Sequence, residues 1–185
     1  MEGDDGLADI DYLIKKSKKG DIASFINLIK PKQEMIYKVA WSYLENNYDV
    51  EDCVVDTTIT AFDKLHQLKK IDSFYTWYMS ILINKCRAYC RNKRKNIYLE
   101  DELYEPQDFA SYTNVEDRLI AESIMSSLKG RNRDILVLKY LEGFTLREIG
   151  IIMKIPENTV KSMLYRTLKK LRIEMAVNKD KKLEV

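Results

Sequence analysis

The sequence predicts an all-α fold of two small helical domains joined by an acidic, flexible linker. Gly and Pro are scarce, at 6 and 3 of 185 residues, and apolar residues recur at spacings of three and four along most of the chain. The charge distribution then divides the chain: residues 98–117 carry seven acidic side chains and no Lys or Arg, and both flanking segments are net positive. The expected divisions are 1–97, 98–115, 116–178 and a Lys-rich tail at 179–185.

Four helices are expected in the first third of the chain. Apolar periodicity predicts helices over residues 9–19, from Ile22 to Pro31, and over 32–44, with Gly20-Asp21 separating the first two. Glu45 to Tyr48 is polar and is predicted to be a loop. Asp49 is expected to cap a helix over residues 50–65, because a carboxylate at this position accepts hydrogen bonds from free backbone N–H groups.

The helix that follows Asp49 carries an acidic stripe. Glu51 and Asp52 lie in its first turns, where the helix dipole alone explains carboxylates. Asp56 lies about two turns in, beside Thr57 and Thr60, which are expected to be exposed. The dipole does not explain Asp56, so the pattern leaves two interpretations open: a solvated face or a surface that docks on another protein.

A polar connection at 67–73 precedes a predicted helix over residues 74–92. Phe74 and Trp77 are interpreted as core residues, whereas Tyr75 and Tyr78 are expected to be more open. The alternative for these aromatic rings is stacking on unpaired bases. The end of the helix is too basic for an average solvated face and predicts phosphate contact, through Lys85, Arg87, Arg91, Lys93, Arg94 and Lys95.

The C-terminal part predicts a helix-turn-helix. Helices are expected over residues 114–127 and 131–141, the second ended by Gly143. Thr145 and Glu148 have the spacing of a capping box, which predicts a helix to Met153.

Pro156 stops that helix, and a further one begins near Glu157 and frays after Ile173. Its inner side holds Val160, Leu164, Leu168 and Leu171. Its outer side carries amide, hydroxyl and cationic groups that can read base edges and hold phosphates: Asn158, Thr159, Lys161, Ser162, Tyr165, Arg166 and Lys169.

Other classes of function receive little support. The three cysteines, Cys53, Cys86 and Cys90, lack CxxC spacing, and a pair of half-buried thiols is favoured over a redox switch for the last two. His66 is the single histidine, so neither a Ser–His–Asp triad nor a His-rich metal site is expected. No cofactor and no enzymatic activity are expected. There is no apolar run of about 18 residues and no signal segment, which predicts a cytoplasmic protein.

Two helical units in this order, each with a basic surface, resemble an extracytoplasmic-function (ECF) sigma factor of bacterial RNA polymerase. The resemblance rests on GDIASFINLIKP, YDVEDCVVDTTITAFDKL and FYTWYMSILINKCRAYCRNKRK in the first half, and on RDILVLKYLEGFTLREIGIIMKIPENTVKSMLYRTLKKL in the second. The resemblance implies that residues 1–97 form sigma region 2 and residues 116–178 form sigma region 4. Where the family usually has Gln-Glu, this chain has Val55-Asp56.

The resemblance also implies partners and site residues. The partners would be core RNA polymerase, through its β′ clamp helices and β flap, promoter DNA, and an anti-sigma factor. Polymerase docking would use Glu51, Asp52, Asp56 and Thr60. Contact with the −10 element would use Gln67, Lys69, Lys70, Asp72, Ser73, Tyr75, Lys85, Arg87, Arg91 and Arg94. Contact with the −35 element would use Arg147, Asn158, Thr159, Lys161, Ser162, Tyr165, Arg166 and Lys169.

Two other functions remain as alternatives at this stage. A stand-alone helix-turn-helix regulator would bind its operator tightly without polymerase, usually as a dimer. It would have no use for an acidic face at Asp52 and Asp56. A nuclease would need metal-binding carboxylates gathered in a cleft, and acids at helix starts do not fit that requirement.

Overall fold

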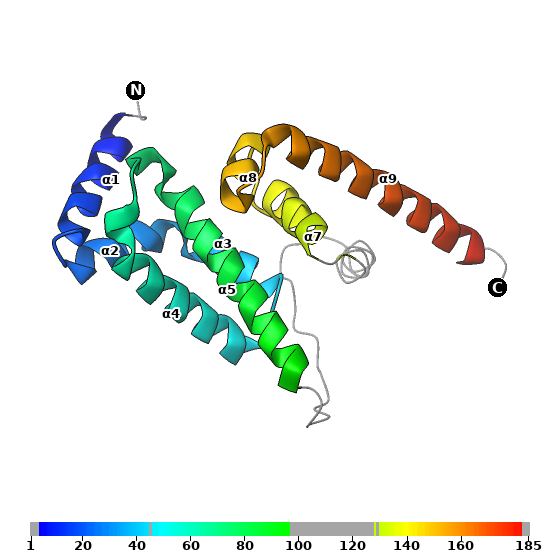
Figure 1. Cartoon of the computed structure of the whole chain (residues 1–185), viewed down its shortest axis with the longest axis horizontal. Helices are drawn as coiled ribbons and strands as arrows, with labels where there is room; N and C mark the ends of the chain where they lie inside the picture. The colour runs from blue at the N-terminus through cyan, green and yellow to red at the C-terminus, as the bar shows by residue number, and fades with distance from the viewer. Residues whose placement is uncertain (1–3, 45, 97–127, 129, 183–185) are drawn as a thin grey trace. The chain divides into compact units, whose positions relative to one another are not determined.

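The computed structural model describes residues 4–44, 46–96, 128 and 130–182, and every element within these ranges is helical (Figure 1). The chain divides into two compact units, Met1–Pro106 and Gln107–Val185. The all-α class and its two helical domains are therefore confirmed. The acidic linker expected at 98–115 lies outside the described residues.

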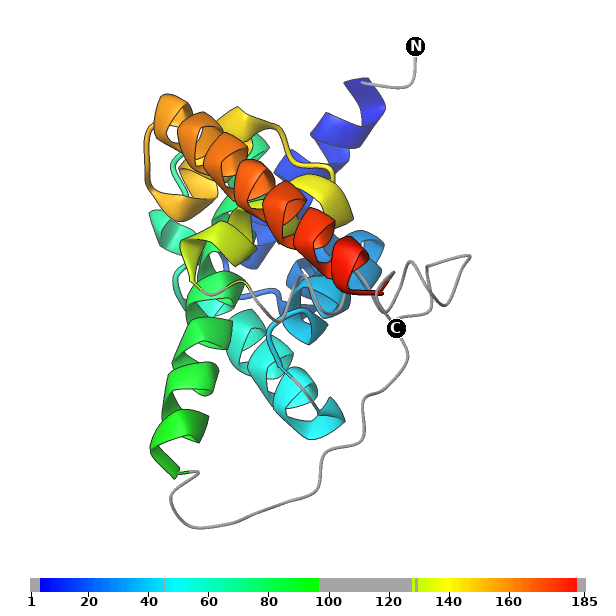
Figure 2. The same cartoon turned by 90° about the vertical axis from the view of Figure 1, so that its right-hand side faces the viewer.

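Unit 1 is a bundle of helices in which α3 contacts both α4 and α5. Helix α1 pairs with α2, and α4 runs alongside α5 (Figures 1 and 2). Gly20, at a φ of 96°, lies in the turn that separates α1 from α2, and Asp21 caps α2 by accepting a hydrogen bond from the Ser24 N–H, as predicted. The helices are α1 Asp4–Ser17, α2 Ile22–Ile29, α3 Gln33–Trp41, α4 Asn47–Asp63 and α5 Phe74–Asn96.

Aromatic side chains join three helices in the core of unit 1. The ring of Phe25 from α2 meets Phe62 of α4 at 5.2 Å between centroids and Phe74 of α5 at 6.1 Å, both edge to face. Phe25 and Phe74 are each 1% exposed. Burial of one such ring contributes roughly 1.5–3 kcal/mol, so this cluster fixes α2 and α5 against α4.

The start of α4 differs from the prediction. Asn46, not Asp49, is the N-cap: its side-chain oxygen accepts the Asp49 N–H at 2.8 Å. Asp49 lies in the first turn, where its carboxylate accepts a hydrogen bond from the Asn46 side-chain amide at 2.7 Å. Asn and Asp cap helices about equally well, so local sequence alone does not choose between the two positions. The predicted loop over 45–48 is correspondingly shorter.

Burial was predicted wrongly for Thr57, Thr60 and Tyr78 of unit 1, of which Thr60 is half-buried and the other two are buried. Tyr78 is 1% exposed, not open, and its hydroxyl lies 3.0 Å from that of Thr58 on α4. Thr57 is fully buried and donates to the Cys53 carbonyl at 2.7 Å. In both cases a polar hydroxyl suggested exposure, but a partner within the bundle satisfies it.

The described part of unit 2 contains three α-helices. They are α7 Arg131–Leu136, α8 Leu146–Met153 and α9 Glu157–Lys182, and α9 packs against both of the others. Helix α7 passes into a π-helical turn, η4, over Val137–Leu141, so the predicted helix at 131–141 is present but changes its hydrogen-bonding pattern. The helix predicted at 114–127 lies outside the described residues.

The last helix is longer than expected. Fraying was predicted after Ile173, where the sequence becomes rich in Lys, yet the α9 backbone remains helical to Lys182 (Figure 1). Lys and Ala are good helix formers, and cations near a helix C-terminus are favoured by its dipole. The predicted inner side is correct for Val160, Leu164 and Leu171, which are 0–7% exposed, whereas Leu168 is only half-buried.

Candidate nucleic-acid interface

The first helix of the predicted helix-turn-helix begins at a complete capping box. The Glu148 N–H donates to Thr145 Oγ1 at 3.2 Å, and the Thr145 N–H donates to Glu148 Oε2 at 2.8 Å. The two residues thus satisfy each other's free backbone donors at the start of α8. This fixes where an eight-residue helix begins, which in turn fixes the turn that follows.

The turn between α8 and α9 depends on two unusual backbone positions. Lys154 has a φ of 55°, in the left-handed region that a side chain disfavours, and closes α8 with its N–H on the carbonyls of Gly150 and Ile151. The Ile155 N–H donates to Gly150 O at 3.0 Å. The chain approaches Gly150 so closely that a Cβ there would lie 2.9 Å from the Ile155 carbonyl oxygen. Pro156 then sets the start of α9.

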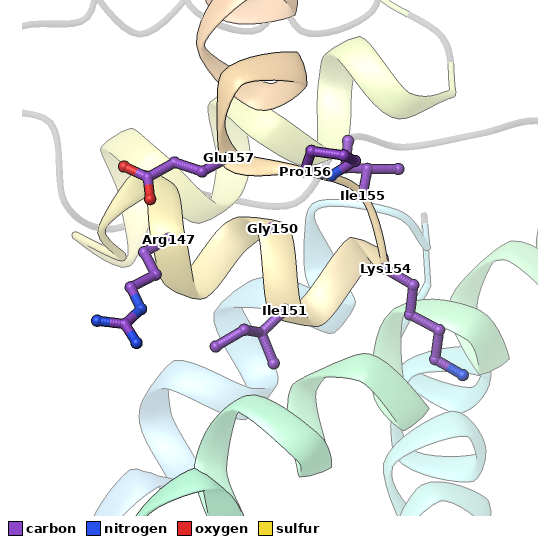
Figure 3. A pocket seen from close by; sticks show the side chains of 7 residues that line it. All are labelled: Arg147, Gly150, Ile151, Lys154, Ile155, Pro156 and Glu157. Carbon is purple, nitrogen blue, oxygen red and sulfur yellow. The ribbon is translucent and has the colours of Figure 1, made fainter.

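An open cleft of about 390 Å³ lies where α8 meets the start of α9. Arg147 and Lys154 stand at the two ends of the outer face of α8, with Ile151 between them (Figure 3). Arg147 is exposed, as expected for a phosphate contact, and Ile151 is 51% exposed. The lining combines two cations with apolar surface, and the cleft is open to solvent. That suits contact with a macromolecule better than enclosure of a small ligand.

The outer face of α9 is exposed throughout the predicted recognition surface. Two contacts order it: Ser162 Oγ donates to Asn158 O at 2.8 Å, and Arg166 Nε donates to Ser162 O at 3.2 Å. Tyr165 is 63% exposed. All of the predicted −35 residues are exposed, including Arg147 on α8 and, on α9, Asn158, Thr159, Lys161, Ser162, Tyr165, Arg166 and Lys169.

The acidic stripe on α4 is partly free and partly engaged. Glu51 and Asp52 are exposed. Asp56 is half-buried: its Oδ2 accepts a hydrogen bond from the Tyr89 hydroxyl at 3.1 Å and lies 3.6 Å from Lys85 Nζ. Thr60 is also half-buried. The sequence predicted Asp56 among the docking acids and Lys85 among the DNA contacts. It did not predict the contact between their side chains.

Two exposed apolar side chains on α4 were not predicted from the sequence as part of the docking face. Val55 and Ile59 are 54% and 56% exposed and lie four residues apart, so they share one face of the helix. They alternate with the acids at Asp52 and Asp56. An exposed apolar pair within an acidic stripe is typical of a protein-docking surface. The sequence feature that could have identified this pair is the i, i+4 spacing of two apolar residues outside the buried stripe of α4.

The connection between α4 and α5 is ordered by short 3-10 helices, η2 Leu65–Gln67 and η3 Ile71–Ser73. Lys18, in the turn directly after α1, donates from Nζ to the Leu68 carbonyl at 3.0 Å, a contact that the sequence did not predict. Ser73 Oγ donates to Lys70 O at 2.7 Å, and Ser73 is half-buried. The remaining predicted −10 residues of this segment are exposed: Gln67, Lys69, Lys70 and Asp72.

Tyr75, at the start of α5, is tethered. Its hydroxyl donates to the Leu28 carbonyl at 3.0 Å, and Lys32 Nζ lies 5.8 Å from the centre of its ring. Burial raises the pKa of Tyr75. The ring is half-buried, so a residue predicted to be open presents only part of its surface.

The basic end of α5 differs along its length. Lys85 and Arg87 are half-buried, whereas Arg91 is exposed. The side chain of Arg94 lies outside the described residues. Burial and the hydrogen bond to Asp56 raise the pKa of Tyr89 to about 12, so its hydroxyl stays protonated at neutral pH and acts as a donor to that carboxylate.

Two of the cysteines meet in the core. Cys53 Sγ of α4 lies 3.5 Å from Cys86 Sγ of α5, and both residues are fully buried. Cys90 is half-buried, and its thiol donates to the Tyr43 carbonyl at 3.3 Å. The neighbouring Cys53 thiol and burial raise the pKa of Cys86, which keeps it protonated. Among the described residues there is no group of three potential metal ligands, and no helix is both long and apolar enough to span a membrane.

Comparison with known protein families assigns both units. A family model described as Sigma-70 region 2 matches residues 28–96, and one described as Sigma-70, region 4 matches residues 118–171, together about two thirds of the chain. The ECF RNA polymerase sigma factor SigW of Bacillus subtilis is 28% identical over 176 residues, covering 88% of this chain and 94% of the relative.

The chain belongs to the ECF sigma factors. RNA polymerase sigma factor SigV of Bacillus subtilis is 27% identical to this sigma factor over 160 residues, covering 86% of this chain and 96% of the relative. The ECF sigma-E factor of Escherichia coli K12 is 26% identical over 168 residues, covering 83% and 87%. Sigma factors are not known as enzymes, and neither family model describes an enzymatic activity.

Solved structures confirm the fold of this ECF sigma factor. CnrH, in complex with the cytosolic domain of CnrY, superposes with a TM-score of 0.67 at 20% identity, covering 90% of this chain and 96% of CnrH. RpoE of Bartonella quintana, in complex with the anti-sigma factor NepR, gives a TM-score of 0.66 at 19% identity, covering 83% and 97%. The resemblance stated from the sequence is therefore confirmed for the family and for the fold, while the roles of single residues remain predictions.

Proposed function

We propose that this ECF sigma factor gives core RNA polymerase its promoter specificity through three surfaces, and that it does so in the cytoplasm. The acidic face of α4 docks on polymerase. The η2–η3 connection and the basic end of α5 hold the −10 element. The outer face of α9 reads the −35 element from the major groove, which has room for one helix.

The observation that carries this proposal is the outer face of α9. A capped α8 and a glycine-dependent turn position a helix whose exposed face carries amide, hydroxyl and guanidinium groups side by side. Bases are discriminated by such groups through paired donors and acceptors, whereas phosphates need only a cation. We therefore assign base contact to Asn158, Lys161 and Arg166, and backbone contact to Arg147 and Lys169.

Docking on polymerase is supported by the composition of the α4 face. Glu51 and Asp52 are exposed, and neither carboxylate forms an ion pair among the described residues. Val55 and Ile59 add apolar surface beside them. A charged and apolar mixture of this kind supplies both orientation and contact area at an interface. A stand-alone DNA-binding regulator has no evident need for it.

Contact with the −10 element is supported by the position of the connection before α5. Lys69 and Lys70 are exposed on a segment held by two 3-10 helices and by Lys18. Extracting a base from the duplex costs a few kcal/mol, and an ordered loop reduces the further entropy cost of capture. We propose that this loop receives the base while Arg87 and Arg91 hold the adjacent phosphates.

An anti-sigma factor is a further proposed partner. The similar structures of CnrH and RpoE were solved with CnrY and with the anti-sigma factor NepR, respectively. We propose that a protein of the anti-sigma class binds this chain as well. The family matches at 28–96 and 118–171 lead us to retain the proposed domain boundaries at 1–97 and 116–178, with a tail from 179.

Run-off transcription tests the proposed function. Sigma-free core polymerase and this protein should together initiate at defined sites on a randomised promoter library, and the protein alone should bind those sites weakly. Tight, specific binding without polymerase would instead support a stand-alone regulator. Metal-dependent cleavage of the DNA by the pure protein would support a nuclease.

A matched pair of variants tests the docking face. Asp52→Lys should abolish capture of core polymerase, because it reverses an exposed charge on α4. Asp9→Lys makes the same change at an exposed position on α1 and should retain capture. Equal polymerase binding by the two variants would remove Asp52 from the docking surface.

A further inference from the structure

One carboxylate connects two surfaces to which the proposed function gives different ligands. Asp56 lies on α4, the helix assigned to polymerase, whereas Lys85 and Tyr89 lie on α5, the helix assigned to promoter DNA. Tyr89 Oη is 3.1 Å and Lys85 Nζ is 3.6 Å from the same atom, Asp56 Oδ2. Lys85 and Tyr89 are four residues apart, so they rise from one face of α5 toward that oxygen.

The engagement is specific to Asp56. Asp52, one turn earlier on α4, is exposed, and its carboxylate has no hydrogen bond or ion pair among the described residues, although its charge acts on Tyr89. Arg91, on the basic end of α5, is likewise exposed without a described partner. Asp56 and Lys85 therefore engage each other across α4 and α5, whereas an acid and a base close by on the same two helices have no ion-pair partner among the described residues.

The contact is weak enough to exchange. The side chains of Lys85 and Asp56 are 32% and 48% exposed, and ion pairs with that degree of exposure contribute little because water and salt screen them. A cation from another protein that reaches Asp56 could replace Lys85 at small cost. The released ammonium would then be available to a backbone phosphate of DNA, where binding of a cation also releases condensed counterions.

We propose that Asp56 couples the two binding surfaces: it restrains Lys85 in the free protein, and docking of α4 on polymerase releases Lys85 to bind promoter phosphate. Tyr89 is a positioning residue that holds Asp56 Oδ2 toward α5. The coupling is reciprocal, because a ligand that draws Lys85 away also frees Asp56 for the docking partner. The release of Lys85 on docking rests on the proposed function, because it requires that α4 binds polymerase. The restraint of Lys85 in the free protein rests only on the contacts of Asp56.

The restraint is tested on the free protein with a 30-base-pair duplex of random sequence as the probe. Asp56→Asn and Asp52→Asn remove the same charge from the same helix, so their general electrostatic effects match. Asp56→Asn should tighten duplex binding about two- to fivefold more than Asp52→Asn, the range expected from loss of one exposed ion pair. In a Lys85→Met background the difference between the two Asn variants should disappear. Equal affinities of the two variants in the Lys85 protein would overturn the restraint.

The release is tested with the complete holoenzyme on a promoter fragment recovered by run-off selection. Lys85→Met should weaken promoter binding by a larger factor in the holoenzyme than it weakens duplex binding by the free protein. Arg91→Met should cost similar factors in both states, because Arg91 has no described partner to lose. An equal cost of Lys85→Met in the two states would overturn the release.

The two experiments distinguish a failure of the coupling from a failure of the proposed function. If no holoenzyme forms, the docking role of the chain is wrong, and the duplex measurements still decide whether Asp56 restrains Lys85. If the holoenzyme initiates correctly while the Asn variants bind the duplex equally, the proposed function stands and the coupling is wrong. Thermal unfolding of each variant confirms that it is folded at the assay temperature.

Discussion

Replacing Gly150 by Ala should disturb the recognition helix more than it disturbs the fold. Gly150 lies inside α8, where the turn to α9 passes against it: a Cβ there would lie 2.9 Å from Ile155 O and 3.5 Å from the Glu157 backbone nitrogen. Both neighbours are backbone atoms, so neither can rotate away. The turn must retreat by about half an ångström to restore ordinary contact, and it carries the start of α9 with it.

The magnitude follows from two opposing effects. Ala is better than Gly in a helix by about 1 kcal/mol. Overpacking against a fixed backbone costs about 1–3 kcal/mol. The net loss of unfolding free energy for Gly150→Ala is therefore about 0–2 kcal/mol. The loss of binding free energy at the −35 element should exceed this loss of stability. A displacement of α9 that removes one base contact costs about 1–3 kcal/mol of binding free energy.

A second glycine provides the control. Gly143 has a φ of 69°, and a Cβ added there would have no neighbouring atom within 4 Å, so Gly143→Ala introduces backbone strain of about 1–2 kcal/mol without touching the turn. Two measurements distinguish Gly150→Ala from Gly143→Ala. They are thermal unfolding and holoenzyme binding to a promoter that depends on its −35 element. Gly143→Ala should lose stability and keep the −35 dependence, whereas Gly150→Ala should lose the dependence while still folded. Full −35 dependence in Gly150→Ala would refute the steric reasoning.

Four further outcomes are expected. Lys154→Gly should raise the unfolding free energy of unit 2 by about 1 kcal/mol, measured by denaturant titration, because Gly adopts a φ of 55° without strain. Burial raises the pKa of Tyr78 to about 12, against about 10 when unfolded, so its contribution of about 2–3 kcal/mol to stability is complete below pH 10 and is lost as pH rises toward 12. Tyr78→Phe should remove this contribution, whereas the part of the slope that comes from Tyr89, whose pKa is also raised to about 12, should remain. A thiol reagent should modify Cys90 first in the native protein and reach the other two cysteines only on unfolding. Arg166→Ala should weaken promoter binding by about 1–3 kcal/mol and relax base preference at one −35 position, whereas uniform weakening across sequences would make Arg166 a phosphate contact.

Local chemistry made much of the C-terminal unit predictable. The capping box at Thr145 and Glu148, the stop at Pro156 and the apolar spacing from Val160 onward each depend on residues within a few positions of one another. The exposed face of α9 then follows from helical geometry, since the residues outside the apolar stripe must face away from the core. That is why every predicted −35 residue is exposed.

Unit 1 was less predictable because its site residues depend on contacts between helices. Tyr78 was expected to be open, yet it is buried against Thr58, and Tyr75 is tethered to Leu28, 47 positions away. Lys18 reaches Leu68 across 50 positions. Periodicity along one helix states which side is apolar but gives no information on which polar group a neighbouring helix brings to it.

The engagement of Asp56 shows what this limit means for function. From the sequence, an acid on α4 and a base on α5 belong to two separate surfaces, because they are 29 positions apart. The packing of α4 against α5 gives them one shared contact. Assigning each residue to one ligand therefore treats the binding of polymerase and the binding of promoter DNA as more independent than this contact allows. If polymerase and promoter each draw one member of the Asp56–Lys85 pair away from the other, a change that strengthens this contact weakens the binding of both, and a change that removes it makes the two binding events independent.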